Sequence, residues 1–533
     1  MCKNIFKSIA IIALIIAFSC AKRGSITGGL KDTLAPIMTQ SLPKNLSTNF
    51  NGKVIKLKFD EYVKLKDVSK QLIVSPPMKN QLEISPQTAT KEITIKIKDT
   101  LQPNTTYSFN FGNSIQDNNE NNPLKQFKYI FSTGKYMDSL VLNAKTKDAI
   151  NKKVDNFVSI MLYEVTDKYT DSIVFKEVPR YITNTLDSLK LVKLENLKQG
   201  KYRLIAIKDV NGNNKFDPTT DKIGFQKEFI KVPNDTLYEL ELFKQEAPFK
   251  AKNSSQLSGN KLIVGYEGNA KDVKISVKKD KEIIPYVVTQ FTKKDSLLVW
   301  VKAQKSDSLT ILVSKNKYEK QFAYKFKNQK KDTLRFSAVQ TDVLPLRDKF
   351  TLIATTPLSK FDNSKMVLLN KDSVAIKFTT EYDDLSQELK FNFTKEPLEK
   401  YKLKIFPGAI TDFFDKKNDT LIYKFSTKNT SDYGNLHIEL ENVKRFPVIV
   451  EITDKEGKVI ASGYSEKEKA VIFDLIDPAI VTLRLIYDDN KNKVWDSGNF
   501  TELRQAEEVI YFSKQVDVRA NWDVVQPFDL KSP

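Results

Sequence analysis

Histidine and cysteine, the side chains that most often supply nucleophilic and zinc chemistry, are scarce in this sequence. Its 533 residues include 2 Cys and 1 His. A Ser/His/Asp or Cys/His catalytic set needs a histidine beside its nucleophile, and zinc is held mainly by His and Cys. The one histidine, His437, alternates with Leu436 and Ile438 as a solvent-facing strand residue would. The sequence therefore lacks the residues for a histidine-dependent catalytic set and for a zinc site.

Two further absences narrow the function. The sequence contains no phosphate-binding loop or dinucleotide fingerprint. Its tryptophans, Trp300, Trp495 and Trp522, are dispersed and argue against the aromatic platform of a sugar-binding module. Hydrolysis by two carboxylates stays open, because a glycosidase needs only a pair of Asp or Glu side chains, but the sequence singles out no pair. We predict a protein that is not an enzyme.

The apolar stretch nearest the N-terminus is too short to span a bilayer. Residues 9–18 give roughly ten apolar positions, against the roughly 20 that a membrane-spanning helix needs. Lys3 and Lys7 come before this stretch, and the small residue Ser19 follows it. This is the layout of a secretory signal, which predicts a signal peptide over residues 1–19.

The residues around Cys20 add a lipid to this prediction. Ala17 and Ser19 before Cys20 resemble a bacterial lipobox, although Phe18 departs from the usual small or polar residue there. The resemblance implies cleavage before Cys20 by signal peptidase II and a diacylglyceryl lipid on its sulfur. The alternative is an ordinary signal peptide with an incidental cysteine. A lipidated chain without Cys2 could form no disulfide and would depend on burial alone.

Positive charge exceeds negative charge, with 85 Lys+Arg against 66 Asp+Glu and a net charge of +19. Basic residues occur in every segment, so the charge reads as diffuse and nucleic acid is a poor partner. A diffuse positive charge would favour anionic lipid headgroups or acidic partners. The alternative is a lysine-rich composition common to the proteins of the source lineage.

Beyond a flexible tether at residues 20–32, the dominant pattern is period-two alternation, in which every second side chain is apolar. It occurs at Ile55, Leu57 and Phe59, and again in residues 93–97 and 107–111. No segment shows a sustained helical stripe. The pattern predicts an all-β chain of serial β-sandwich domains, and its length suggests roughly three to five of them.

One sequence module occurs twice. Residues 101–133 and 398–427 share the order of a strand with a conspicuous tyrosine, an Asp/Asn-rich turn, and a closing strand that ends in Phe-Ser-Thr. With Pro36, Pro43 and the segment 56–61, the first copy resembles the bacterial Ig-like family of S-layer and envelope proteins, in the setting of a Bacteroidota lipoprotein. The resemblance implies Ig-like domains at residues 33–135 and 334–430.

A second module follows each copy of the first. Residues 200–217 and 481–496 each run from a strand into an Asp/Asn loop, with an aromatic residue just before the last aspartate. These segments resemble prealbumin-like β-sandwich domains of exported bacterial proteins. The resemblance implies such domains at residues 136–250 and 431–533, and alternation in residues 251–333 predicts a further β-sandwich between the pairs.

The Asp/Asn loops are the strongest candidates for a metal site. Oxygen-bearing side chains at relative positions 1, 3, 5 and 9 are suited to Ca²⁺, and both loops have this spacing: Asp209, Asn211, Asn213 and Asp217, then Asp488, Asn490, Asn492 and Asp496. Neither loop has the glycine at position 6 or the Glu at position 12 of a helix-loop-helix Ca²⁺ site. We therefore favour a tight turn held by Asx hydrogen bonds, with a structural Ca²⁺ ion as the alternative and no cofactor required.

These features predict a non-catalytic lipoprotein of the outer membrane. It would act as a multidomain scaffold or accessory subunit for outer-membrane proteins, and the resemblance extends this to the β-barrel assembly or surface-lipoprotein export machinery. A glycan-binding surface lipoprotein is the alternative, and a carboxylate-dependent hydrolase is a third. The leaflet stays open between the cell surface and the periplasmic face.

Overall fold

The computed structural model describes residues 31–187, 191–279, 282–291, 294–302 and 307–531. The predicted signal peptide, Cys20 and the tether as far as residue 30 lie outside the described residues. Within the described part of the chain, no helix is both long and apolar enough to cross a membrane.

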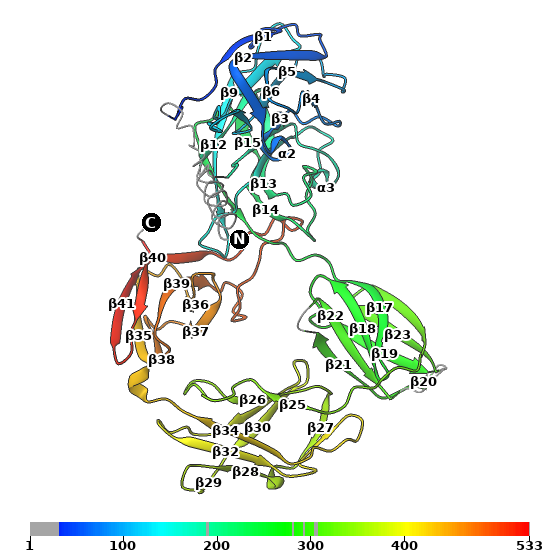
Figure 1. The fold of residues 1–533 in the computed structure, drawn as a ribbon, viewed down its shortest axis with the longest axis vertical. Helices are drawn as coiled ribbons and strands as arrows, with labels where there is room; N and C mark the ends of the chain where they lie inside the picture. Colours follow the sequence, from blue (N-terminus) through cyan, green and yellow to red (C-terminus); the bar gives the residue numbers. More distant parts are fainter. Residues whose placement is uncertain (1–30, 188–190, 280–281, 292–293, 303–306, 532–533) are drawn as a thin grey trace, which may run out of the picture. The chain divides into compact units, whose positions relative to one another are not determined.

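The chain divides into two compact units, residues 1–139 and 140–533. Nearly every regular element is a strand, and the two α-helices of the described chain each span four residues (Figure 1). The all-β fold predicted from the alternation is therefore confirmed. Buried hydrophobic side chains form separate clusters in consecutive stretches of chain. We name these stretches the first to fifth sandwich.

The first sandwich makes up the described part of the first unit. Its sheets have the orders β1-β2-β5-β4, with β7 also paired to β2, and β3-β6-β8. Ile55, Leu57 and Phe59 of β2 are buried and the lysines between them are exposed, because alternate side chains of a strand point to opposite faces. The elements are β1 (Met38–Leu42), β2 (Val54–Leu65), α2 (Val68–Gln71), β3 (Ile73–Ser75), β4 (Glu83–Ser85), β5 (Thr90–Lys96), β6 (Thr106–Asn110), β7 (Ile115–Asp117) and β8 (Lys128–Ser132).

The second sandwich opens the second unit. One sheet has the order β11-β10-β13-β14, with β15 also paired to β13, and the other has the order β12-β9-β16. The pairing of β9 with β16 is parallel. The elements are β9 (Leu140–Asp148), β10 (Ser159–Glu164), α3 (Ile173–Lys176), β11 (Tyr181–Asn184), β12 (Leu191–Leu197), β13 (Gly200–Lys208), β14 (Lys222–Phe225), β15 (Ile230–Val232) and β16 (Leu237–Leu242).

The third sandwich packs two four-stranded sheets, β17-β18-β22-β21 and β20-β19-β23-β24. Its core joins Leu262 and Val264 of β18 to Val299 of β22 and Ile311 of β23. The strands are β17 (Lys250–Ser258), β18 (Lys261–Glu267), β19 (Lys274–Lys279), β20 (Glu282–Ile283), β21 (Tyr286–Phe291), β22 (Ser296–Val301), β23 (Ser308–Lys315) and β24 (Tyr318–Lys325).

The fourth sandwich has the sheets β25-β26-β31-β30, β29-β28-β32-β34 and the short pair β27-β33. The elements are β25 (Phe336–Ala338), β26 (Phe350–Ala354), β27 (Leu358–Phe361), the 3-10 helix η1 (Asn363–Lys365), β28 (Met366–Leu369), β29 (Ala375–Ile376), β30 (Thr379–Asp383), β31 (Glu388–Asn392), β32 (Lys400–Ile405), β33 (Ile410–Asp412) and β34 (Leu421–Ser426).

The sequence module that occurs twice makes the same hydrogen bonds in both copies. The Tyr107 hydroxyl accepts the backbone N–H of Gln102 at 2.9 Å, and the Tyr401 hydroxyl accepts that of Glu396 at 2.8 Å. Both tyrosines are buried, so the hydroxyl needs a partner and ties the strand to the turn before it. The threonine that ends each module donates to the backbone carbonyl of the same residue, Gln102 or Glu396.

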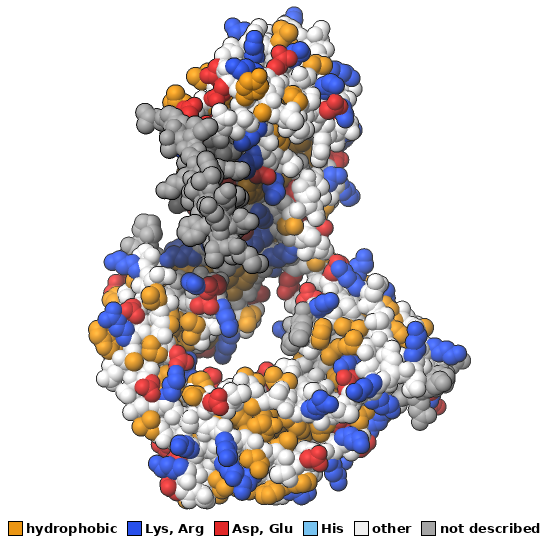
Figure 2. Space-filling view, viewed as in Figure 1, with side chains coloured by type: hydrophobic (Ala, Val, Ile, Leu, Met, Phe, Trp, Pro, Cys, Tyr) orange, Lys and Arg blue, Asp and Glu red, His pale blue; other side chains and the backbone are white. Residues whose placement is uncertain are grey.

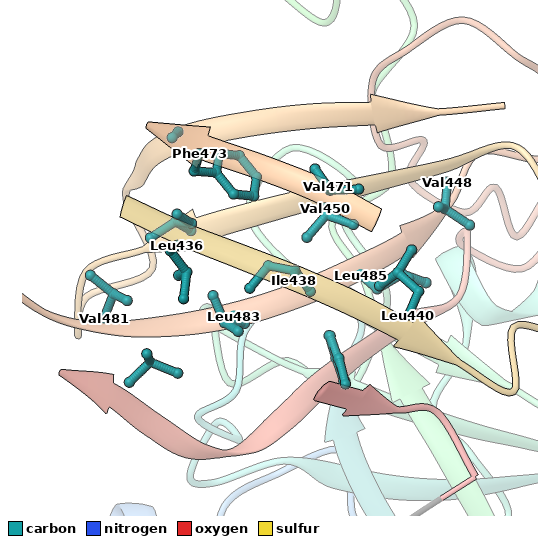
Figure 3. Close-up of a cluster of buried hydrophobic side chains, with 14 of the residues drawn as sticks. Leu436, Ile438, Leu440, Val448, Val450, Val471, Phe473, Val481, Leu483 and Leu485 are labelled. Atoms are coloured by element: carbon teal, nitrogen blue, oxygen red, sulfur yellow. The ribbon is translucent and has the colours of Figure 1, made fainter. Parts of the chain in front are cut away.

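The fifth sandwich repeats the topology of the second. Its sheets have the orders β37-β36-β39-β40 and β38-β35-β41, and its first and last strands, β35 and β41, pair in parallel as β9 and β16 do. Figure 3 shows apolar side chains such as Leu436, Val450 and Leu483 meeting between the sheets. The elements are the 3-10 helix η2 (Thr430–Asp432), β35 (Gly434–Glu441), β36 (Val448–Thr453), β37 (Val459–Ser465), β38 (Ala470–Ile476), β39 (Ala479–Tyr487), β40 (Val509–Val518) and β41 (Asp523–Asp529).

Candidate functional site

The first Asp/Asn loop connects β13 to β14 and closes on its own backbone. The Asp209 carboxylate accepts the N–H of Gly212 at 2.7 Å and that of Asn214 at 2.6 Å. The Asn213 side chain accepts a further backbone N–H two residues on, and Asn211 donates to a threonine hydroxyl. These are the bonds of an Asx turn, the arrangement that the spacing predicts.

A buried carboxylate that the sequence pattern did not single out completes this loop. Asp221 is fully buried, and its oxygens accept the N–H of Val210 at 3.0 Å and that of Asp217 at 2.9 Å. Asp217 itself accepts the hydroxyl and the N–H of Thr219, and these bonds lower its pKa. Asp221 therefore joins the start of the loop to its end.

The second loop, between β39 and β40, has the same plan. The buried Asp488 accepts the N–H of Asn492 at 3.0 Å and that of Lys493 at 2.9 Å. The side-chain amides of Asn490 and Asn492 both donate to one oxygen of Asp496, at 2.5 and 2.6 Å. Two of the four spaced side chains thus act as donors toward a third.

Glu507 occupies in the second loop the role that Asp221 has in the first. It is buried and accepts the N–H of Asp489 at 2.8 Å and that of Asp496 at 2.9 Å. Burial raises the pKa of the Glu507 carboxyl, and the nearby charges of Asp496 and Asp488 raise it further. In the sequence, Asp221 and Glu507 are each a carboxylate downstream of the last aspartate of their loop, and this position is the signal that could have identified them.

Hydrogen bonds within the protein thus engage both oxygens of Asp209 and of Asp488. The described residues contain no group of three or more His, Cys, Asp and Glu side chains that could hold a metal ion. The turn accounts for the spacing in each loop, and a structural Ca²⁺ ion stays the untested alternative.

The two loops differ in length where they close. Asp221 follows Asp217 by four positions, whereas Glu507 follows Asp496 by eleven. The extra length of the second loop forms the segment 497–505, which we call the clasp. The clasp contacts the second sandwich, about 250 residues earlier in the same unit.

Phe500 is the centre of the clasp. It is fully buried, and its ring centroid lies 5.2 Å from that of Phe225 and 6.1 Å from that of Phe175. Its N–H donates to the side-chain oxygen of the buried Gln245 at 2.7 Å, and Gln505 donates to the carbonyl of Phe225 at 2.8 Å. An aromatic anchor surrounded by satisfied polar groups is how stable protein contacts are built.

Glycine at position 498 lets the clasp approach the second sandwich closely. A Cβ on Gly498 would lie 2.5 Å from ring atoms of Phe243, which is inside van der Waals contact. Beside it, the Ser497 hydroxyl donates to the carbonyl of Lys244 at 2.6 Å. Position 498 is therefore closed to any larger residue unless Phe243 moves.

A second set of bonds joins the same two sandwiches. The carbonyl of Ile150 accepts a hydrogen bond from Arg484 at 3.0 Å and one from the Tyr511 hydroxyl at 2.6 Å. Arg484 is buried and paired with Glu451 at 2.6 Å, so its guanidinium is held in place. Lys152 donates to two backbone carbonyls of β40.

The third and fourth sandwiches are also in contact. Trp300 is buried, with its ring centroid 6.2 Å from that of Phe414, and Lys302 pairs with Asp415 at 2.5 Å. The N–H of Gln290 donates to a backbone carbonyl of the fourth sandwich. Trp300 is thus buried at the contact between the third and fourth sandwiches.

The fourth and fifth sandwiches meet through side chains near η2. Lys428 pairs with Asp477 at 3.1 Å and lies over the ring of Tyr433. Arg347 donates to the carbonyl of Asp474 at 2.9 Å. Within the second unit, the fourth sandwich therefore contacts both the third and the fifth.

His437 lies on the outer face of β35, as the alternation predicts. Its neighbours Leu436 and Ile438 are buried, and 39% of its side chain is exposed. Its Nε2 atom is 3.8 Å from a carboxylate oxygen of Asp474. This exposure and the buried neighbours confirm the solvent-facing interpretation of His437. The sequence also has no second histidine to complete a metal or catalytic pair.

Comparison with known proteins supports an Ig-like domain at the start of the described chain. Residues 32–133 match the family described as bacterial Ig-like domain. The Ig-like resemblance of the first module is therefore confirmed. No curated protein matches the chain.

Solved structures with similar folds include proteins of bacterial surfaces. The surface layer protein SbsC, domains 1–6, has 10% identity and a TM-score of 0.15, over 91% of this chain and 67% of that one. A variant of BcpA, the major pilin subunit of Bacillus cereus, has 11% identity and a TM-score of 0.14, over 73% of this chain and 99% of that one.

Proposed function

We propose that this chain is a non-catalytic lipoprotein of the outer membrane, anchored through Cys20, that acts as a multidomain scaffold or accessory subunit for outer-membrane proteins. The β-barrel assembly and surface-lipoprotein export machineries are the partners that the sequence resemblance suggests. The leaflet, cell surface or periplasmic face, is left to experiment.

The observation that carries this proposal is the clasp. A scaffold must hold its binding surfaces at fixed positions, and serial sandwiches on free linkers would not do so. Phe500 and Gly498 in one sandwich, and Phe225 and Phe243 in another, form a buried contact between parts of the chain that are far apart in sequence. This contact, with the joints at Trp300 and near η2, favours one arrangement of the second unit.

The glycan-binding alternative receives less support. Within the described chain, the exposed large aromatic side chains are Tyr62, Tyr136, Phe361, Phe406 and Trp522, and they belong to the first, fourth and fifth sandwiches. A sugar-binding platform would gather such rings on one face. Their dispersal favours a protein partner over a glycan.

The test is affinity purification of the tagged protein from solubilised outer membranes, followed by mass spectrometry. We expect a stable outer-membrane protein partner to be recovered in constant ratio to the chain. The test variant is Phe500→Ala, which weakens the clasp and leaves the lipid anchor intact. We expect this variant to recover less of the partner than the parent chain does. Recovery of the chain alone would refute the scaffold.

A further inference from the structure

The net positive charge is concentrated in particular sandwiches. Residues 251–333 hold 18 lysines against 8 Asp+Glu, a net charge of +10, whereas residues 431–533 hold 13 Lys+Arg against 19 Asp+Glu, a net charge of −6. A lysine-rich composition shared by the whole chain would not produce opposite signs in two of its sandwiches. The interpretation of the charge as diffuse is therefore corrected, and the third sandwich needs an explanation of its own.

The two sheets of the third sandwich differ in how far their outer faces are covered. On the sheet that contains β22, the outward residues Leu298 and Trp300 are buried, as is Thr289 of β21. This is the side that contacts the fourth sandwich through Trp300 and Lys302. The other sheet, β20-β19-β23-β24, leaves its outer side chains exposed or half-buried.

The outer face of the sheet β20-β19-β23-β24, which we call the lysine face, is hydroxyl-rich and basic. The strand register places Lys278 opposite Thr310 and Lys274 opposite Ser314, and Lys325 lies opposite Ser308. Its outward residues are Lys274, Ser276, Lys278, Ile283, Ser308, Thr310, Leu312, Ser314, Glu319, Gln321, Ala323 and Lys325. Among the described residues, three lysines thus share the face with one glutamate.

The three lysines differ from other lysines of this sandwich in their pairing. Elsewhere in this sandwich, Lys252, Lys261 and Lys279 each pair with a carboxylate. Within the described part of the chain, Lys274, Lys278 and Lys325 are in no ion pair. Their ammonium groups are therefore available to an external anion.

An exposed apolar side chain accompanies them. Ile283 of β20 lies opposite Lys278 in the register, so both point to the same side of the sheet, and Ile283 is 68% exposed. Figure 2 shows Lys and Arg side chains around the tip of the third sandwich where Figure 1 labels β20. An apolar residue among free lysines is the pattern of a surface that meets lipid headgroups.

We propose that the lysine face is a docking surface for anionic membrane lipids, whose headgroup phosphates its lysines contact. A layer of anionic headgroups is recognised by charge at short range and demands no matching shape, which suits a face of Ser, Thr and Lys. A protein partner would need an apolar or aromatic core at the interface, and Leu312 and Ile283 are the only large apolar residues among the outward positions of the lysine face. The contact is additional to the lipid on Cys20.

The test is flotation of the chain, secreted with Cys20→Ser so that it carries no lipid, with vesicles of phosphatidylcholine alone or with about a third phosphatidylglycerol. We expect binding to the anionic vesicles that falls as salt rises. The triple variant Lys274→Gln, Lys278→Gln, Lys325→Gln should weaken binding by on the order of a hundredfold, because each lysine near an anionic surface contributes about a fivefold factor.

The matched control removes the same charge from the same sandwich away from this face. Lys327, Lys330 and Lys331 are exposed, and the segment that holds them is hydrogen-bonded to β17 and the turn after it in the other sheet. The triple Gln variant at these positions should bind anionic vesicles within about threefold of the parent chain. Equal losses in both triples, no binding to anionic vesicles, or displacement by inorganic phosphate at constant ionic strength would each overturn the proposal.

Discussion

The ring of Phe500 lies 5.2 Å from the ring of Phe225, centroid to centroid, with an interplanar angle of 72°. The two residues are 275 positions apart in the sequence. Both rings are buried, and edge-to-face packing of such rings is favourable. Serial sandwiches alone would form an extended chain, and this contact instead brings the fifth sandwich back to the second.

Phe500→Ala should release the clasp. Removing a fully buried ring costs about 3 to 5 kcal/mol when the site cannot collapse, which is comparable to the whole stability of a contact of this kind. We expect a larger radius of gyration by small-angle X-ray scattering and faster hydrogen exchange at residues 222–225. Thr501→Ala, at an exposed neighbour in the same loop, is the control, and equal scattering curves for both variants would contradict the prediction.

Gly498→Ala should weaken the same contact by overpacking, at a cost of about 1 to 3 kcal/mol. The new Cβ meets the ring of Phe243, so Phe243→Leu, which removes the clashing ring atoms, should restore part of the loss. A double-mutant cycle read by hydrogen exchange at residues 243–245 measures the coupling. Purely additive effects would show that position 498 acts in some other way.

Replacing Asp209 and Asp488 by alanine tests the two loops for calcium. Because backbone N–H groups already occupy both carboxylates, we expect no saturable heat on titration of Ca²⁺ into the parent chain. The double variant should give the same calorimetric trace. A binding isotherm that appears in the parent and is lost in the variant would establish the structural ion instead.

Glu507→Gln should make the second loop less sensitive to pH. Burial and the neighbouring Asp496 and Asp488 raise the pKa of Glu507 above its ordinary value of 4.5, so the folded chain binds this proton more tightly than the unfolded chain. The stabilisation is therefore gained as pH falls through the raised value and is absent well above it. We expect the parent loop to gain protection relative to the variant as the pH falls toward the ordinary glutamate pKa of 4.5.

Hydrogen exchange at the amides of Asp489 and Asp496, which donate to Glu507, provides the measurement. Taking the ratio of parent to variant rates cancels the intrinsic pH dependence of exchange. A ratio that does not change with pH would contradict the raised pKa.

Cys20→Ser should release the protein from the membrane. A diacylated cysteine anchors a chain through its buried methylene groups, and a serine cannot be acylated in this way. We expect the parent chain to incorporate labelled palmitate and to sediment with outer membranes washed at high salt, which screens the lysine face, and the variant to do neither. Membrane retention of the unlabelled variant would mean that another contact is sufficient, for which the lysine-face triple variant is the control.

The sequence alone determined the fold class, because a strand buries every second residue and this period is visible in residues such as Ile55, Leu57 and Phe59. It also showed the duplication, since Tyr107 and Tyr401 sit in matching modules and keep matching hydrogen bonds. The turn chemistry of Asp209 and Asp488 was readable as well, because Asx bonds join residues only three to five apart.

Only the tertiary structure decided which distant residues meet. Phe500 and Phe225 are ordinary aromatic residues in the sequence, and their contact depends on how whole sandwiches pack. Likewise, Lys274 and Lys325 fall on one face only because β23 lies between their strands and pairs with both. Local sequence patterns fix the strands and the turns. The contacts between distant sandwiches depend on long-range burial, which leaves no period in the sequence.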